Sequence, residues 1–156
     1  MDIKEKARQK LTERGVTVDD MAIIVLESQL KYNPNLTIEL CKEAIESVLS
    51  KREVIHTILT GIALDEATEK NLFEPEINKI ILDDTPLYGI DEILALSIVN
   101  IYGTIALTNF GYLDKVKPGI VGKIDQLGKD SIECHTFLDD IVSAIIAAAM
   151  SRIAHH

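Results

Sequence analysis

Three groups of acidic residues in the second half of the chain have the types and spacing needed to bind a divalent cation. They are Asp91-Glu92, Asp114 with Asp125, and Asp139-Asp140, and the lysines between them are Lys115, Lys117 and Lys123. Hard cations such as Mg²⁺ prefer carboxylate oxygens, and usually take one or two carboxylates together with waters and a substrate phosphate. Carboxylate pairs at the starts of neighbouring helices could face each other across such an ion, with a lysine placed to neutralise a phosphate. This pattern suggests phosphoryl-transfer chemistry.

A purely structural role is the alternative for each of these acids. Acids in the first turn of a helix are favoured by capping and by the helix dipole, by about 0.3–1 kcal/mol each. Spacing alone supports a cap and a ligand equally for Asp139, and it favours simple dipole complementarity for Asp91 and Glu92. Asp140 is harder to explain in this way, because it is a second acid beside the cap of an Ala-rich helix. Single lysines are typical of solvated surface.

Other catalytic classes lack their motifs. The chain contains no HExxH, CxxC or GxxxxGK[ST] sequence, and neither cysteine opens a Cys-x₅-Arg loop, which disfavours zinc-protease, P-loop and cysteine-phosphatase chemistry. His56 lies in an apolar-periodic segment, where a structural role is expected. His135 precedes Asp139 by four residues and could share its site, but a loop histidine is the simpler interpretation. Asp65-Glu66 is predicted to lie on a solvated helix face.

Helix start and stop signals recur along the whole chain. Capping boxes are predicted at Thr17/Asp20, at Ser50/Glu53, and at Thr136/Asp139 before a final helix from residue 137 to about 154. Pro75 suits the first turn of a short helix, and residues 83–89 are predicted to form a loop. Sustained period-two alternation does not occur. We therefore expect an all-α protein of about seven or eight helices, with residues 1–156 forming one domain.

The longest apolar stretch, residues 89–109, has two interpretations. No charge occurs between Glu92 and Asp114, and the polar exceptions, which are Ser97, Asn100, Thr104 and Thr108, form one narrow helical stripe. A helix over residues 93–110 would be roughly 27 Å long, which is marginal for a bilayer core of about 30 Å. We therefore favour a buried central helix over about residues 91–109, surrounded by the other helices, rather than a membrane span.

Composition narrows the functional classes. The formal net charge of −9 argues against non-specific nucleic-acid binding and against a polybasic membrane anchor. The two cysteines form no close-spaced motif, and the N-terminus has charges where a signal peptide needs its apolar segment. A cytoplasmic protein that is not integral to the membrane is expected, and homo-oligomerisation is compatible with the sequence.

Three segments resemble the phosphatidylglycerophosphatase A family in order and spacing. Asp91-Glu92 followed by the apolar stretch is similar to that family's Asp-Glu motif. Leu113-Asp114-Lys115-Val116-Lys117-Pro118, with Asp125 beyond it, resembles its Leu/Phe-Asp-x-x-Lys-Pro segment. Leu138-Asp139-Asp140-Ile141-Val142, running into an Ala-rich helix, resembles its Asp-Asp motif. The resemblance covers residues 83–154.

The resemblance implies a Mg²⁺-dependent phosphatase of lipid metabolism that converts phosphatidylglycerophosphate to phosphatidylglycerol. It implies candidate catalytic residues Asp91, Glu92, Asp114 and Asp140, metal ligands Asp91, Glu92, Asp139 and Asp140, and phosphate contacts Lys117 and Lys115. The Gly/Pro-rich segment of membrane-bound members is missing, and the first 80 residues have polar-faced helices. A smaller phosphate ester is therefore an alternative substrate, and a peripheral contact with the inner face of the membrane is compatible with the sequence.

Two hypotheses follow. The leading one is a helical Mg²⁺-dependent phosphomonoesterase. The second is a non-enzymatic helical binding or oligomerisation protein, in which the acids only cap helices. They differ in one geometric expectation, because only the enzyme requires Asp91-Glu92 and Asp139-Asp140 to converge within metal-bridging distance.

Overall fold

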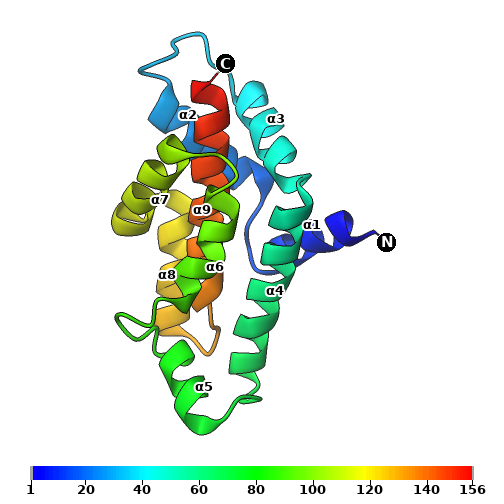
Figure 1. Ribbon diagram of the computed structural model, residues 1–156, viewed down its shortest axis with the longest axis vertical. Helices are drawn as coiled ribbons and strands as arrows, with labels where there is room; N and C mark the ends of the chain where they lie inside the picture. Colours follow the sequence, from blue (N-terminus) through cyan, green and yellow to red (C-terminus); the bar gives the residue numbers. More distant parts are fainter. Residues whose placement is uncertain (1, 156) are drawn as a thin grey trace.

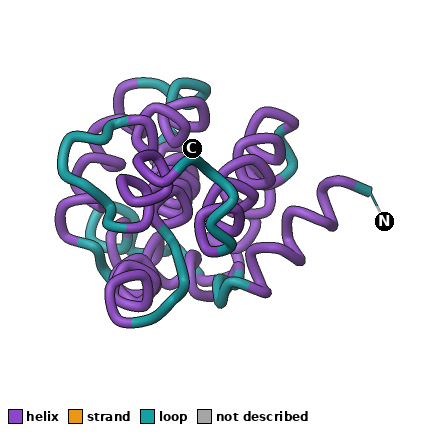
Figure 2. The backbone as a smooth tube through the Cα atoms, turned by 90° about the horizontal axis from the view of Figure 1, so that it is seen from below, coloured by secondary structure: helices purple, strands orange, loops and turns teal. Residues whose placement is uncertain are grey.

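The computed structural model describes residues 2–155, with the backbone alone at residue 130. In this part of the chain there are nine helices and no strand. Figures 1 and 2 show how the helices are arranged. The helices are α1 (Ile3–Glu13), α2 (Val18–Gln29), α3 (Ile38–Leu49), α4 (Arg52–Glu69), α5 (Pro75–Leu82), α6 (Ile90–Val99), α7 (Thr104–Val116), α8 (Gly119–Asp130) and α9 (Thr136–Ala154). The prediction of an all-α fold in one compact domain is confirmed, with somewhat more helices than expected.

The C-terminal helix α9 is the centre of the fold. Every residue from Thr136 to Ser151 is buried, and α2, α3, α4, α6, α7 and α8 all pack against it. In Figure 1 it runs along the long axis of the molecule, with these helices around it. Small residues such as Ala144, Ala147 and Ala148 let the surrounding helices approach closely, and Ile, Leu and Val fill most of the remaining core.

The uncharged stretch 91–109 is not the buried central helix that its composition predicted. It forms α6 and α7, which are separated by a turn at Gly103. Gly103 has φ +88° and ψ −163°, a backbone conformation that residues other than glycine rarely adopt. Only one stripe of α7, formed by Ala106, Phe110 and Leu113, is buried, while Thr104 and Thr108 face outward. Among the described residues, no helix is long and apolar enough to cross a membrane.

The predicted helix caps have mixed outcomes. The capping box of Thr17 and Asp20 is present at the start of α2. The box predicted at Ser50 is wrong, because Lys51 occupies the N-cap position of α4 and no side chain caps it. The box predicted at Thr136 is also wrong, since Thr136 lies inside α9 and its hydroxyl donates to the carbonyl of Ile81.

Asp65 of α4 caps α9 instead. Its two carboxyl oxygens accept hydrogen bonds from the backbone N–H groups of Phe137, at 3.0 Å, and Leu138, at 2.9 Å. The side chain is completely buried, so the prediction of a solvated face is wrong for Asp65. Burial raises the pKa of Asp65 to about 7, against the opposing effects of these two donors and of Arg14. The first turn of the central helix is therefore fixed by a residue from another helix.

Replacing Asp65 by alanine should remove both acceptors and leave two buried N–H groups without partners. We expect Asp65→Ala to lower the free energy of unfolding by about 2–4 kcal/mol. Thr37→Ala is the matched control, because Thr37 caps α3 at an exposed position and its loss should remove only about 1 kcal/mol. Urea unfolding of both variants measures the difference, and a loss no larger than that of Thr37→Ala would contradict the role of Asp65.

Candidate metal and phosphate site

Three segments distant in the sequence meet around one cavity of about 190 Å³. They are the loop after α5 with the first turn of α6, the C-terminal end of α7, and the start of α9. The charged residues that line it are Asp84, Asp91, Glu92, Asp114, Lys117, Asp139 and Asp140. The convergence of the Asp-Glu and Asp-Asp pairs, on which the enzyme hypothesis depends, is therefore present in the structure.

Asp140 lies at the buried side of this cavity. Only 3% of the residue is exposed, and its carboxyl shares hydrogen bonds with those of Asp114 and Asp91. Burial, together with the adjacent Asp139 and these two carboxyls, raises the pKa of Asp140 far above its ordinary value. Without a cation, Asp140 therefore holds a proton at neutral pH. This proton allows three acidic side chains from α6, α7 and α9 to lie in contact.

Lys117 provides the cationic charge of the cavity. Its Nζ atom lies 3.2 Å from Oδ2 of Asp139 and 3.4 Å from Oδ1 of Asp114. Partial burial disfavours the ammonium, but Asp139, Asp114 and Asp125 outweigh this effect and raise the pKa of Lys117 above its usual range. The ammonium thus remains charged and offsets part of the acidic charge. Asp139 is used in this ion pair and does not cap α9.

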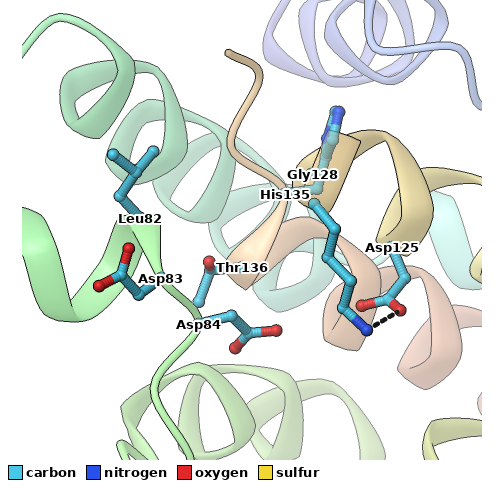
Figure 3. A pocket seen from close by; sticks show the side chains of 8 residues that line it. Leu82, Asp83, Asp84, Asp125, Gly128, His135 and Thr136 are labelled. Atoms are coloured by element: carbon cyan, nitrogen blue, oxygen red, sulfur yellow. Dashed lines mark ion pairs between the residues drawn. The ribbon is translucent and has the colours of Figure 1, made fainter. Parts of the chain in front are cut away.

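A second group of acids shares Asp139 with the Lys117 ion pair. It consists of Asp84, Asp125 and Asp139. One carboxylate oxygen of each lies within 4.8 Å of the others. Asp84 is exposed as a whole residue, but its carboxyl group is partly buried. This burial, together with the nearby Asp91 and Asp125, raises the pKa of Asp84 to about 6. Figure 3 shows the carboxyl of Asp84 directed toward Asp125, whereas that of Asp83 is directed away.

A larger hollow of about 370 Å³ adjoins this second group. Asp84 lines both cavities, and Lys129 pairs with Asp125 at 3.1 Å inside the larger one. His135 also lines this hollow. As predicted, it is a loop residue, and it is the last one before α9, where it is buried at the N-cap position. Burial and the nearby Arg14 lower the pKa of His135, so its imidazole is neutral. His135 is not among the groups that surround Lys117.

The backbone around Lys117 is tightly constrained. Lys117 has φ +53°, caps the end of α7, and donates its N–H to the carbonyl of Leu113 at 2.8 Å. Pro118 follows, and α8 then packs so closely that a Cβ atom at Gly122 would collide with the carbonyl oxygen of Lys117. Glycine at position 122 therefore permits the turn that directs the Lys117 side chain toward Asp139.

Six of the seven site residues predicted from the sequence line the cavity. The exception is Lys115, which is exposed in the last turn of α7 and does not line it. Asp125 does not line this cavity, but it belongs to the second group of acids with Asp84 and Asp139. Sequence reasoning missed Asp84, which was placed in a loop without a role. Its signal was its position, because Asp83 and Asp84 directly follow α5 and precede the predicted Asp-Glu motif by only a few residues.

The side chains of the cavity fit a hard cation. Carboxylate groups from three segments line the cavity, and no Cys or His is among the described residues that line it, so the available ligands suit Mg²⁺ better than Zn²⁺. A lysine at the same site could bind a phosphate oxygen. The arrangement can therefore hold a divalent cation and a phosphate group together.

Comparison with known proteins agrees with this arrangement. A family model described as Phosphatidylglycerophosphatase A matches residues 16–155. Two Bacillus subtilis proteins described as uncharacterized, YpjQ and YutG, are 55% and 54% identical to this chain. Their alignments span 95% and 98% of this chain, and 82% and 91% of the relatives. The low temperature requirement C protein from Listeria monocytogenes has a crystal structure that matches with a TM-score of 0.95 and 54% identity, over 99% of this chain and 96% of that one.

The family match is much longer than residues 83–154, which carried the resemblance, because it includes α2 to α5 as well. The motif residues and the helices that position them therefore belong to one shared pattern. The chain belongs to the phosphatidylglycerophosphatase A family.

Proposed function

We propose that this protein is a Mg²⁺-dependent phosphatase that hydrolyses a phosphate monoester, and that its substrate is the lipid phosphatidylglycerophosphate. The observation that carries the proposal is the convergence of Asp91, Asp114 and Asp140 beside the Lys117–Asp139 ion pair in one cavity. Membership in the family supports the reaction type and the lipid substrate. Helix capping alone gives no reason for acids from three helices to meet around one cavity.

The carboxylates have two tasks in this proposal. Asp140, Asp91 and Asp114 are close enough to act on one cation, and Asp139 with Asp84 and Asp125 could hold a second. Mg²⁺ bound by these groups would polarise the phosphoryl oxygens and lower the pKa of a bound water. Because the ligands must be ionised, the proton on Asp140 would leave when a cation binds.

Lys117 would contact the phosphate. In the metal-free protein its ammonium is held by Asp139 and Asp114, so it already lies at the place where a phosphate oxygen would approach. With a cation held by Asp139 and Asp114, the Lys117 ammonium would be available to pair with a phosphate oxygen and to offset negative charge there. Its left-handed turn and Gly122 keep the side chain in position during this exchange.

Proton transfer to the leaving alkoxide needs a group that titrates near neutrality. Burial and the neighbouring Asp91 and Asp125 raise the pKa of Asp84 to about 6. Burial, with Asp114 and Asp91, also raises the pKa of Glu92, which lies at the exposed edge of the cavity. We assign the proton transfer to Glu92, because it faces the cavity and is not one of the three acids that could hold a second cation.

One test of the proposed function concerns the metal. The purified chain should release inorganic phosphate from phosphatidylglycerophosphate in mixed micelles with Mg²⁺ and not with EDTA, and glycerol 3-phosphate should be tested beside it as a small ester. Asp140→Asn should fold normally and lose activity by roughly 100-fold or more, because an amide cannot become an anionic ligand. Asp19→Asn is the control, since Asp19 is an exposed acid paired with Lys42 on the surface.

Full Mg²⁺-dependent activity in folded Asp140→Asn would contradict the proposal. So would a calorimetric titration in which the wild-type chain binds neither Mg²⁺ nor Mn²⁺. Either result would favour the alternative of a helical binding protein whose acids stabilise helix starts.

Another test of the proposed function concerns the position of the Lys117 side chain. Gly122→Ala places a methyl group against the Lys117 carbonyl and should shift the turn, lowering kcat by roughly 10- to 100-fold while Mg²⁺ binding persists. Gly111→Ala is the matched control, because it makes the same change in a helix where open space surrounds the new methyl group. Equal kcat values for the two variants, measured with circular dichroism as a check of folding, would refute this positioning role.

A further inference from the structure

Helix α7 lies at the outside of the bundle and presents an uncharged face to water (Figure 1). The residues opposite its buried stripe are exposed, and none of them up to Tyr112 is charged. We call this surface the α7 face, and it consists of Thr104, Ile105, Leu107, Thr108, Gly111 and Tyr112. Its three large apolar side chains are between 41% and 59% exposed. An exposed apolar patch of this kind often marks a contact with another molecule.

Gly111 lies in this face, although the fold of the chain does not require a glycine there. It is inside α7, where glycine destabilises a helix relative to alanine, and a Cβ atom at position 111 would meet nothing within 4 Å. Every other glycine of the chain has either a positive φ or a neighbouring atom within 4 Å of the place where its Cβ would lie. The space over Gly111 is therefore available to a group from outside the chain.

The charges of the chain favour a second copy as the occupant of the α7 face. The formal net charge is −9, so most surfaces of two copies repel each other. Near α7 the negative charge lies at the C-terminal end of the helix, where Asp84, Glu92 and Asp114 line the acidic cavity. Two α7 faces can meet without bringing carboxylates together, whereas a basic partner would find no acid on this face to pair with.

An antiparallel contact between two α7 helices fits both the charge and the space over Gly111. In a two-fold contact, residue i of one copy meets residue j of the other, and j meets i. The 13 residues of α7 span roughly 20 Å, so an antiparallel contact keeps the two acidic cavities at opposite ends. If the axis passes beside Thr108, Ile105 of each copy lies over Gly111 of the other, because each is three positions from Thr108. A parallel contact would leave that space empty.

Lys115 fits the same arrangement. It is exposed one turn beyond Gly111, at the C-terminal end of the α7 face. In the antiparallel contact it meets the turn between α6 and α7 of the second copy, because Lys115 and Ile101 are each seven positions from Thr108. Helix α6 ends at this turn, and the C-terminal end of a helix favours a cation. A parallel contact would instead bring the two Lys115 side chains together.

We propose that the protein forms a two-fold symmetric dimer through the α7 face, with the two α7 helices antiparallel and crossing at Thr108. The side chain of Ile105 in each copy packs over Gly111 of the other, where the missing Cβ lets the two helices approach closely. None of the residues of the α7 face lines the acidic cavity, so the inference does not depend on the proposed phosphatase function.

The test is the molecular mass of the full chain in solution, measured by light scattering and by sedimentation equilibrium over a range of concentrations. The wild type should have twice the mass of one chain, which is 17.3 kDa. Thr108→Glu places two carboxylates beside the two-fold axis and should raise the dissociation constant of the dimer by roughly 30-fold or more. Thr60→Glu is the control, because Thr60 is an exposed threonine within α4 that gains the same charge.

Gly111→Leu distinguishes this contact from general attraction between apolar surfaces. The substitution adds an apolar side chain and a better helix former, and open space within the chain accommodates it, so the folded monomer should be retained. Because the new side chain takes the place of Ile105 from the second copy, the dissociation constant should rise by roughly 30-fold or more. Ala63→Leu is the control, since it adds a leucine at an exposed position of α4, and it should keep the wild-type mass.

Three results would overturn the inference. The first is a wild-type chain that stays monomeric at every concentration. The second is a Gly111→Leu variant that associates as well as the wild type or better, because general apolar attraction would then be sufficient. The third is an equal loss of association in Thr60→Glu and Thr108→Glu, because net charge rather than the α7 face would then decide the mass. Circular dichroism checks that each variant keeps its helices.

Discussion

The hydrogen bonds from Phe137 and Leu138 to Asp65 fix the helix on which the rest of the molecule packs. A helix start leaves backbone N–H groups without partners, and water cannot satisfy them when that start is buried. The start of α9 is buried against its neighbours, so the acceptor has to come from another helix, and Asp65 of α4 provides it. The next two residues are Asp139 and Asp140. The cap that allows α9 to be central therefore also sets the position of the two acids that face the cavity.

The second constraint is the concentration of negative charge at this end of the bundle. Six carboxyl groups line one small cavity, together with a single ammonium. In the metal-free protein the repulsion is relieved by a proton on Asp140, by the ammonium of Lys117, and by the positive ends of the α6 and α9 dipoles, since both helices begin at the cavity. Such an arrangement does not favour stability by itself. It is the kind of local conflict that proteins retain where a function requires it.

The sequence predicted the elements that depend on local signals. The capping box at Thr17, the all-helical pattern and the acids heading the last helix all follow from short-range spacing, and the structure has them. The role of Asp65 could not be predicted, because its partners lie more than 70 residues away and the neighbouring Glu66 made the segment resemble a solvated face. Asp84 was missed for a similar reason. Its loop lies beside α8 and the start of α9 in the folded chain, although it is more than 30 residues away from them in the sequence.

The stretch between Glu92 and Asp114 shows a different limit of such reasoning. Burial in a core and insertion in a membrane both account for such a stretch, because each removes apolar side chains from water. The structure has neither. Gly103 breaks the stretch into two helices, each of which buries one side and exposes the other.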